Sequence, residues 1–202
     1  MKLNIGCGFN KLDGYSNVDQ FPECAPDVLW DLEQTPWPFA ESSVEELVAH
    51  HVLEHLGQET KVFFAIIKEL YRIMRHDGLV RIAVPHPHHP TYLSDPTHVR
   101  PFMGNTFEML NRAKNLDWAE RNVNVTMLAL MLDVNFETIS AVQNYDRRWR
   151  EKVKSGELTR DQLRDIADTQ LGVIKELKFV LRADKSHLAD TAELEDVPDD
   201  KP

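Results

Sequence analysis

Short apolar runs alternate with polar turns over the first half of the sequence, and this alternation restricts the fold more than any other feature. Four runs of strand-like composition come first: Lys2–Ile5, Tyr15–Asp19, Val28–Leu32 and Val44–His51. Apolar residues then recur at helical spacing over Gln58–His76, with Gly78 as the expected stop before a strand at Leu79–Val84. Val44–His51 is also compatible with the start of a helix. The alternation is typical of an α/β fold on a mostly parallel sheet.

The connections between the first three predicted strands are unusually short. About nine residues separate Gly8 from Val18, and the gap between Asp19 and Val28 is equally small, whereas a crossover between parallel strands normally needs about a dozen. We therefore expect loops or single helical turns there, which leave part of one sheet face without a helix. Because parallel sheets are ordinarily apolar on both faces, the C-terminal helices or a second copy of the chain are expected to cover it.

The second half continues the pattern with longer helical segments. Its predicted elements are helices at Thr106–Leu116 and Trp118–Leu132, a strand at Asp133–Val142, charged helical segments within Tyr145–Leu171 and a strand at Val173–Arg182. Gly156 is expected to break the charged segment, and Thr159 with Gln162 matches a capping box. We expect one domain over residues 1–183, with residues 144–172 as a helical insertion before the last strand.

The charge of the chain limits its partners. The formal net charge of −10 argues against a nucleic-acid surface, because phosphate binding needs clustered Lys and Arg. Half of this excess lies in residues 184–202, which hold seven acidic residues and two lysines. Such a segment buries too little apolar surface to fold alone, so it is predicted to be a disordered tail.

Cysteine usage and hydropathy bear on the compartment. Cys7 and Cys24 are too few for a disulfide framework, which favours a reducing environment. No apolar run approaches membrane-spanning length, and the sequence begins with a strand pattern rather than a signal peptide. We therefore expect a cytoplasmic protein that binds neither nucleic acid nor a membrane.

The first predicted strand runs into the turn Gly6-Cys7-Gly8. Glycines at a strand end let the backbone approach a ligand closely, because they have no Cβ, although glycines also mark ordinary turns. A dinucleotide fingerprint would place a third glycine where the sequence has Lys11. The short crossover also offers no full helix N-terminus to a pyrophosphate. Both observations weigh against a nicotinamide-dependent oxidoreductase.

Aspartates end the second and third predicted strands. The carboxylate of Asp19 is placed to accept hydrogen bonds from both hydroxyl groups of a ribose. Asp31, with the backbone N–H of Leu32, is placed to recognise an adenine edge. Each aspartate alone is equally well explained as the cap of a turn, but their position at successive strand ends favours a nucleoside site.

Five segments in order carry a family resemblance: Leu3-Asn4-Ile5-Gly6-Cys7-Gly8, Gly14-Tyr15-Ser16-Asn17-Val18-Asp19, Asp31-Leu32, His51-Val52-Leu53-Glu54-His55-Leu56 and Glu69–Leu79. The ordered set resembles the motifs of class I S-adenosylmethionine-dependent methyltransferases. The short first half and the segment Asp95–Phe102 (DPTHVRPF) resemble a compact bacterial and phage-type subgroup. The resemblance covers residues 2–102, and the last strand more loosely. It implies a Rossmann-like, mostly parallel sheet of about seven strands with an antiparallel final strand, and methyl transfer from S-adenosylmethionine.

The resemblance also implies a cofactor site. The adenosine part would be bound by the glycine turn and the two strand ends, at Gly6, Gly8, Asp19, Asp31 and Leu32. The methionine part would lie near Asn4, Cys7 and the backbone around His50 and His51. The family usually has an acidic residue where this chain has Asn4, so one negative charge is missing, although an amide oxygen still accepts a hydrogen bond.

Seven of the nine histidines fall in two zones after the fourth and fifth predicted strands: His50, His51 and His55, then His86, His88, His89 and His98. Ligands of open α/β sheets lie at the C-terminal ends of the strands, so both zones are expected to face one crevice. A hydroxyl acceptor needs a base, and histidine suits that role near neutral pH. The predicted catalytic residues are His86 and His98 as bases, Asp95 as their orienting carboxylate, and next Glu54 and His55.

A metal bound by several of these histidines with Asp95 is the alternative. The spacing His86-x-His88-His89 matches no familiar zinc pattern, so no metal is predicted. The Asp/Asn-Pro-Pro-Tyr/Phe signature of nucleobase methylation is absent after the fourth strand. We therefore predict O-methylation of a small molecule, sugar or glycan hydroxyl.

Two further functions and an assembly state stay open. A non-catalytic partner module that binds S-adenosylmethionine is suggested by Asn4 and by the missing N-terminal helix, and the nicotinamide-dependent enzyme is disfavoured by the glycine spacing. The short crossovers favour a homodimer formed near the second and third strands. Its predicted aromatic anchors are Phe21, Trp30, Trp37 and Phe39.

Overall fold

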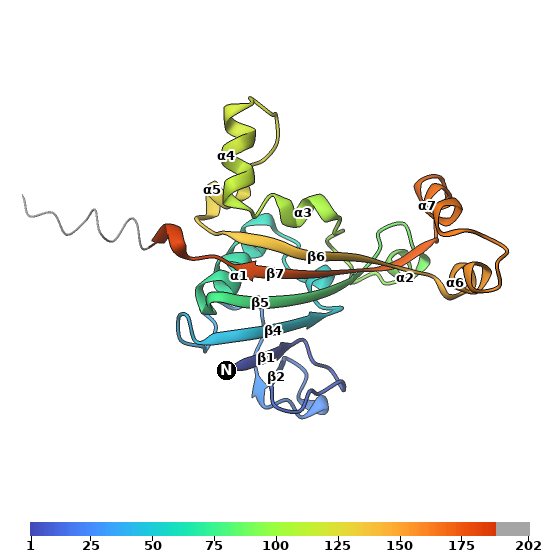
Figure 1. Cartoon of the computed structure of the whole chain (residues 1–202). Helices are drawn as coiled ribbons and strands as arrows, with labels where there is room; N and C mark the ends of the chain where they lie inside the picture. Colours follow the sequence, from blue (N-terminus) through green and yellow to red (C-terminus); the bar gives the residue numbers. More distant parts are fainter. Residues whose placement is uncertain (189–202) are drawn as a thin grey trace, which may run out of the picture.

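Within residues 1–188, the part of the chain that the computed structural model describes, seven strands form one sheet in the order β3-β2-β1-β4-β5-β7-β6 (Figure 1). The strands are β1 (Lys2–Ile5), β2 (Ser16–Asp19), β3 (Val28–Leu29), β4 (Val44–His50), β5 (Met74–Pro85), β6 (Phe136–Tyr145) and β7 (Ile174–Ala183). The first five pair in parallel, and β7 lies antiparallel between β5 and β6. The predicted mostly parallel sheet with an antiparallel final strand is confirmed.

The helices are mostly shorter than predicted. They are α1 (Thr60–Ile73), α2 (Pro90–Leu93), α3 (Gly104–Glu108), α4 (Arg112–Glu120), α5 (Leu128–Leu132), α6 (Arg147–Lys154) and α7 (Arg160–Thr169), with the 3-10 turns Pro22–Cys24 and Leu53–His55. The two long helices predicted before residue 132 are therefore wrong. The side chain of Asn111 caps α4, and Asn122 adopts a φ of 53° just after it, so the helical hydrogen bonding is interrupted at both points.

Helix α1 covers one face of the sheet and supplies much of the core. Phe63, Ile66 and Leu70 are at most 4% exposed and pack against every second residue of the central strands. Those strand residues include Leu3, Ile5, Leu47, Ala49, Val80, Ile82, Phe179 and Leu181. Because successive side chains of a strand point to opposite faces, the register of the sheet places all of them on the α1 side.

The junction of α1 and β5 differs from the prediction. The helix ends at Ile73 and the strand begins at Met74, whereas the sequence suggests a helix end at His76 and a stop at Gly78. Met74 is fully buried and pairs with Val44, so the chain enters the sheet as soon as the helix ends. Gly78 lies inside β5, where a Cβ would come within 2.6 Å of the Met74 methyl group.

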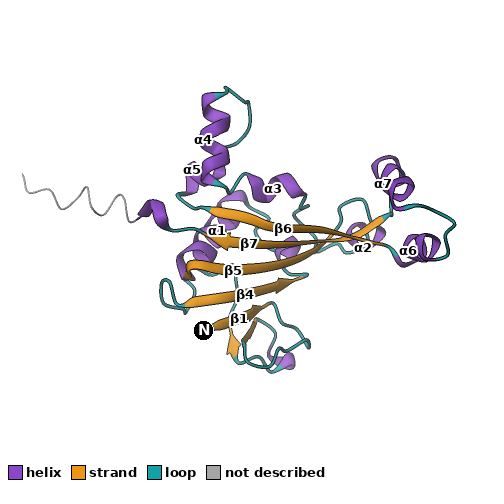
Figure 2. Ribbon diagram, in the orientation of Figure 1, coloured by secondary structure: helices purple, strands orange, loops and turns teal. Residues whose placement is uncertain are grey.

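The opposite face of the sheet has no helix over the middle of β4 and β5 (Figure 2). The register places Lys2, Glu46 and Arg81 on this open face. The Glu46 carboxylate forms ion pairs with Nζ of Lys2 at 3.1 Å and with Nε of Arg81 at 2.6 Å. This face therefore carries a cluster of ion-paired side chains beside apolar residues such as Val48 and Leu79, and its charged part is suited to contact water.

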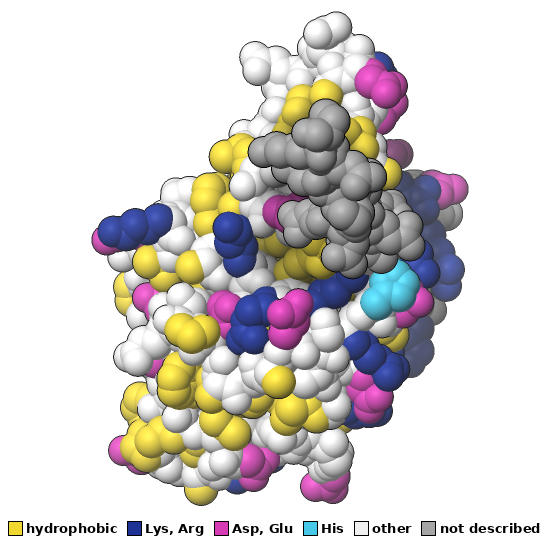
Figure 3. Space-filling model, turned by 90° about the vertical axis from the view of Figure 1, so that its left-hand side faces the viewer, with side chains coloured by type: hydrophobic (Ala, Val, Ile, Leu, Met, Phe, Trp, Pro, Cys, Tyr) yellow, Lys and Arg dark blue, Asp and Glu magenta, His cyan; other side chains and the backbone are white. Residues whose placement is uncertain are grey.

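Strands β6 and β7 continue this polar face. Arg182 pairs with Glu137, and Nδ2 of Asn144 donates to Oε2 of Glu176 at 2.6 Å. Figure 3 shows acidic and basic side chains gathered along its right-hand edge, which is the margin of the open face. The expectation of a face that is apolar throughout is therefore wrong, because charged and amide side chains stand among its apolar residues. The C-terminal helices project beyond the sheet instead of covering β1 to β3 (Figure 1).

The aromatic anchors predicted for a homodimer divide into two groups. Trp37 and Phe39 are 2% and 8% exposed and belong to the core of the chain itself. Trp30 is partly buried against the same core, and Phe21 is 60% exposed. The two buried rings cannot contact a second copy, so two of the four predicted anchors are wrong.

Buried amides replace a crossover helix between β1 and β2. The side chain of Asn17 accepts hydrogen bonds from Nδ2 of Asn4 at 2.9 Å and from the N–H of Leu12 at 2.8 Å. It donates to the carbonyl oxygens of Leu12 and Tyr15, and to the Asp27 carboxylate at 2.8 Å. The loop crossover is as predicted, and this network satisfies backbone groups that a helix would otherwise pair.

The ion-paired glutamate of the open face should make stability depend on pH. Its partners, Arg81 first, lower the pKa of Glu46 from 4.5 to about 2. A depressed folded-state pKa stabilises the fold above the unfolded value, and this contribution disappears as the pH falls from 4.5 toward 2. We expect Glu46→Gln to lower the free energy of unfolding by about 1 kcal/mol at pH 7, since both cations are partly exposed and screened.

Urea unfolding at pH 7, 5 and 3 measures this effect. Glu45→Gln is the matched control, because that carboxylate lies 3.6 Å from Arg75 in a more exposed ion pair. A difference between Glu46→Gln and the parent that persists undiminished at pH 3 would contradict the assignment.

Between β6 and β7 the chain leaves the sheet as two helices, which we call the α6–α7 arm (residues 146–172; Figure 1). Gly156 separates the helices with a φ of 81°. The N–H of Gln162 donates to the Thr159 hydroxyl and the N–H of Thr159 donates to the Gln162 amide, which confirms the capping box.

The C-terminal segment begins on the surface of the domain. The hydroxyl group of Tyr71 donates to the Asp184 carbonyl, and Nζ of Lys185 donates to Arg72 O and to Ser42 Oγ. The start of the predicted tail is thus packed, and its residues 189–202 lie outside the described residues. Between residues 1 and 188, no helix has both the length and the apolar composition to cross a membrane.

Candidate active site

The turn after β1 brings the backbone to a cavity at the C-terminal ends of β1 and β4. Gly6 has a φ of 59°, and a Cβ there would lie 2.3 Å from Cγ2 of Val52, so the position requires glycine. Gly8 has a φ of 49° and faces open space. The cavity, of about 340 Å³, is lined by Asn4, Gly6, Cys7, Gly8, Asn10, Leu12, His50 and His51. The residues predicted to bind the methionine part of the cofactor therefore line one cavity.

Asn4 and Cys7 have structural roles within this cavity. Nδ2 of Asn4 donates to the Asn10 carbonyl at 3.0 Å and to Oδ1 of Asn17 at 2.9 Å, so the amide at the family's acidic position also holds the turn. Burial, together with the charge of Asp19, raises the pKa of the Cys7 thiol to about 11. Cys7 is therefore a neutral thiol near pH 7.

Asp19 is held rigidly where β2 ends. Its Oδ2 accepts from the N–H of Gly8 at 2.8 Å, and its Oδ1 accepts from the N–H of Phe21 at 2.9 Å. Each carboxylate oxygen retains acceptor capacity for a ligand. A second cavity, of about 180 Å³, is lined by Gly6, Asp19, Gln20, Trp30, Asp31, Leu32, His51, Val52, His55 and Leu56. It adjoins the first at Gly6 and His51, so the two together form an elongated site.

Asp31 combines the two roles that the sequence left open. Its Oδ1 accepts from the N–H of Glu33 at 2.9 Å and its Oδ2 from the side chain of Gln34, which is the pattern of a turn cap. It also lines the second cavity beside Leu32. The hydrogen bonds of this turn therefore fix the positions of Asp31 and Leu32 at the cavity.

His51 lies between the two cavities and β7. Its φ is 53°, its Nε2 is 2.9 Å from Glu176 Oε1, and its Nδ1 is 3.4 Å from Glu54 Oε1. The carboxylates of Glu54 and then Glu176 raise the pKa of His51, although burial opposes them. His51 is thus linked to β7, a contact that no local sequence pattern indicates.

His55 and His98 come together from different loops, with ring centroids 4.6 Å apart. Nδ1 of His98 is 2.8 Å from the Tyr92 carbonyl, which can only accept, so this nitrogen carries the proton. Nδ1 of His55 is 2.8 Å from Oγ1 of Thr97, whose hydroxyl donates to Asp95 at 2.6 Å. In the neutral form, each ring therefore has its lone pair on Nε2. Asp95 orients His55 through Thr97, and lies 3.8 Å from Nε2 of His98.

Glu54 lies directly beside this pair and is fully buried. Neither of its carboxylate oxygens has a hydrogen-bond partner among residues 1–188. Its backbone carbonyl accepts from the N–H groups of Val99 and Arg100, which attaches the loop carrying His98. Arg100 stacks on Phe63 at 4.0 Å from the ring centroid and donates to a backbone carbonyl, so it neither pairs with Asp95 nor neutralises Glu54.

The histidines after β5 have other roles. The N–H of His88 donates to Nδ1 of His86 at 3.2 Å, so neutral His86 presents an N–H group to its cavity, and burial lowers its pKa. His89 accepts from the N–H of Thr91, and its Nε2 is 3.4 Å from Asp146 at the root of the arm. His86 thus faces the crevice as a donor, and His89 is structural.

The sequence matches no protein-family model and no curated protein. Solved structures do share its architecture. A S-adenosylmethionine-dependent methyltransferase from Archaeoglobus fulgidus is 17% identical, with 90% of this chain and 85% of that chain covered and a TM-score of 0.55. The N-methyltransferase NodS from Bradyrhizobium japonicum is 12% identical, with 91% and 85% covered and a TM-score of 0.52. The chain has the class I methyltransferase fold.

The same fold is present in a protein that is described as a cyclase. The [4+2]-cyclase SpnF is 11% identical, with 91% of this chain and 75% of that chain covered and a TM-score of 0.53. The class I methyltransferase fold therefore does not by itself decide the reaction, and the function has to be argued from the site. The compact subgroup that the sequence resembles is not distinguished by these comparisons.

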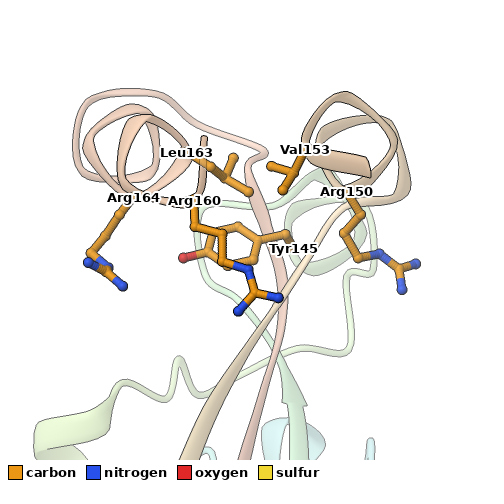
Figure 4. Close-up of a pocket in the computed structure, with 6 residues that line it drawn as sticks. All are labelled: Tyr145, Arg150, Val153, Arg160, Leu163 and Arg164. Carbon is orange, nitrogen blue, oxygen red and sulfur yellow. The ribbon is translucent and has the colours of Figure 1, made fainter. Parts of the chain in front are cut away.

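A groove leads from the histidine loop of this methyltransferase fold into the arm. One cavity, of about 440 Å³, contacts His86, Gly104 and Phe179 and reaches Tyr145 and Arg164. A second, of about 350 Å³, lies between α6 and α7 (Figure 4) and is lined by Tyr145, Arg150, Val153, Arg160, Leu163 and Arg164. The two cavities adjoin at Tyr145 and Arg164.

The arginines of this groove were not predicted as site residues. Arg164 pairs with Asp161, but Arg150 and Arg160 form no ion pair within the described chain. In a sequence with a net charge of −10, cations clustered without partners were the signal that could have indicated an anion site. Their meeting depends on how the arm folds back at Gly156, which the sequence pattern alone does not specify.

Proposed function

We propose that this protein transfers a methyl group from S-adenosylmethionine. The observation that carries the proposal is the elongated pair of cavities, which gathers the glycine turn, Asp19, Asp31 and Leu32 at the C-terminal ends of β1, β2 and β4. The ribose would bind Asp19, the adenine would bind Asp31 and Leu32, and the methionine end would lie beside Asn4, Cys7 and the backbone at His50 and His51. The methyltransferases that share this fold support the choice of cofactor.

We further propose that the acceptor is a hydroxyl group. S-adenosylmethionine would supply the methyl group: the hydroxyl oxygen would bond to the methyl carbon as the carbon–sulfur bond breaks, and S-adenosylhomocysteine would leave with that electron pair. The hydroxyl proton passes to an imidazole. Nε2 of His55 or His98 fits this role better than His86, because both have an unprotonated Nε2 backed by a hydrogen bond at Nδ1. In-line geometry supplies much of the remaining acceleration.

The groove toward the arm supports a class of acceptor. Its apolar and aromatic lining consists of Tyr145, Val153 and Leu163, and the side chains of Arg150 and Arg160 line it as well (Figure 4). Guanidinium groups bind carboxylates and phosphates in a bidentate manner. We therefore propose a small molecule, sugar or glycan that carries a negative charge as well as the methylated hydroxyl.

The two cysteines bear on the cellular compartment of the protein. Cys7 and Cys24 are both buried and free. A cytoplasmic location is the proposal that accords with unpaired cysteines.

The cofactor assignment predicts a defined loss of affinity. Asp19→Ala should weaken S-adenosylhomocysteine binding by about 1–3 kcal/mol, because the ribose hydroxyls lose a charged acceptor. Isothermal titration calorimetry measures the dissociation constant. Asp13→Ala is the control, since Asp13 is an exposed acid in the loop before β2 and lines neither cavity. An unchanged affinity in folded Asp19→Ala would reject the ribose site.

A methyl-release assay decides between an enzyme and a binding module. Acceptor pools are separated by charge and incubated with labelled S-adenosylmethionine, and turnover is expected in an anionic pool. Binding of S-adenosylhomocysteine without turnover in any pool would support the non-catalytic module, and binding of NAD alone would support the oxidoreductase.

A further inference from the structure

Glu54 is a buried carboxylate whose two oxygens accept no hydrogen bond. It is 0% exposed, and both oxygens lack a hydrogen-bond partner in the described part of the chain. Nδ1 of the half-exposed His51 lies 3.4 Å from one of them, and the other nitrogen of that ring pairs with Glu176 at 2.9 Å. A buried charge needs a close, well-oriented counter-charge, and an imidazole shared with a second carboxylate meets this need incompletely.

The two imidazoles next to Glu54 are prepared to bind something electrophilic. Tyr92 O and Thr97 Oγ1 occupy the Nδ1 atoms of His98 and His55 and leave each Nε2 with its lone pair. Such hydrogen bonds at the distal nitrogen are typical of metal-bound histidines, because they fix the ring and its tautomer. One donor atom from each of Glu54, His55 and His98 lies within 4.8 Å of the others.

We propose that Glu54, His55 and His98 bind a divalent transition-metal ion. Two imidazole nitrogens and one carboxylate form a donor set that suits Zn²⁺, Fe²⁺ and similar ions and leaves coordination positions open. The spacing that argued against a metal, His86-x-His88-His89, involves other residues. Glu54 and His55 are adjacent in the segment after β4, and His98 lies more than 40 residues later, in the segment after β5.

A second donor cluster in the chain is less suited to a metal. Cys7, Asp19 and Cys24 also bring donor atoms within 4.8 Å of one another. A thiol binds a metal as the thiolate, and burial raises the pKa of Cys7 to about 11. Each Asp19 oxygen already accepts one backbone N–H group, and its remaining acceptor capacity is assigned to the ribose. The Glu54 cluster, in contrast, has two free nitrogens and an unpartnered carboxylate.

The metal would deepen the proposed methyl transfer, on which this part of the inference rests. His55 also lines the cavity assigned to the adenosine part of the cofactor, which adjoins the cavity of the methionine end at Gly6 and His51, so the ion would lie beside the bound cofactor. A divalent cation lowers the pKa of a hydroxyl group that coordinates it. The two imidazoles would then act as ligands instead of as the base, and the proton of the cation-bound hydroxyl group would pass to solvent water.

The test measures metal binding without any enzymatic readout. The full chain is stripped with a chelator and titrated with Zn²⁺ by calorimetry and with Co²⁺ by visible absorption, which reports the ligand set. We expect one ion per chain, and affinities at least about tenfold lower in Glu54→Gln and His98→Ala. His76→Ala removes an exposed histidine outside the cluster and should leave the affinity unchanged.

Several outcomes would overturn the site. They are the absence of stoichiometric binding, equal affinities in the parent and in both ligand variants, or a loss confined to Cys24→Ser. If Glu54→Gln does not fold, as circular dichroism would show, His55→Ala and His98→Ala carry the comparison. Calorimetry with S-adenosylhomocysteine on the metal-free chain separates the two proposals. A chain that binds the cofactor but binds no metal ion refutes this inference alone, and a chain that binds the metal ion but not the cofactor refutes the proposed function alone.

Discussion

His98→Ala is expected to lose turnover by about 10²–10⁴-fold while its affinity for S-adenosylhomocysteine stays nearly unchanged. The Tyr92 carbonyl fixes the proton of the His98 ring on Nδ1, which leaves Nε2 of the neutral ring with its lone pair; the ring lies beside His55, and His98 is not among the residues that line the cofactor cavities. As proton acceptor or as metal ligand, the imidazole contributes to the transition state rather than to adenosine binding. Single-turnover kinetics with labelled cofactor, combined with calorimetry, measures both quantities.

His88→Ala is the control for this loss. His88 is exposed in the segment after β5. Its hydrogen bonds in the structure use its backbone N–H and carbonyl, which the substitution retains, so turnover should be preserved. His86→Ala should act mainly on the KM for the acceptor, because His86 presents an N–H group. Full activity of His98→Ala on the true acceptor, or an equal loss in His88→Ala, would refute the assignment.

Asn17→Ala is expected to lower the free energy of unfolding by about 2–4 kcal/mol. The substitution removes the shared partner of Asn4, Asp27 and the β1–β2 loop, and leaves several buried polar groups unpaired. No crossover helix is present to replace these bonds. Chemical denaturation followed by circular dichroism gives the difference.

Asn10→Ala is the matched control for that experiment. Asn10 lies in the same loop and is exposed, and its hydrogen bonds use backbone atoms, which the substitution retains. It should change stability by less than about 0.5 kcal/mol. Equal stabilities of the two variants would show that the amide network is not what holds the short crossover.

The order of the elements could be predicted because local patterns encode it. Apolar spacing located α1 and β7 within three residues and found β5 without its first five residues, and glycine with a capping box located the break in the arm. The open sheet face could not be predicted in the same way, because short runs such as Val44–His51 were treated as buried on both sides. Their charged residues, Glu46 above all, become informative only when the register shows that they share a face with Lys2 and Arg81.

In the candidate site, too, the residues placed by local patterns could be predicted, and those placed by contacts between loops could not. Residues at strand ends, such as Asp19, could be placed because parallel strands end at one edge of a sheet. The roles within the histidine zones depend on contacts between loops. Hydrogen bonding distinguishes His98 from His86, and neither the Tyr92 carbonyl nor the Thr97 hydroxyl has a sequence signature for such a contact.

The open polar face also determines which changes in chain length this protein tolerates. A full helix inserted between β1 and β2 would exclude water from Lys2, Glu46 and Arg81, whose charges now rely on it. Crossover length and the outward residues of the strands are thus coupled. Grafting a longer crossover should succeed only if these three residues become apolar in the same step, and making them apolar without the graft should cause aggregation.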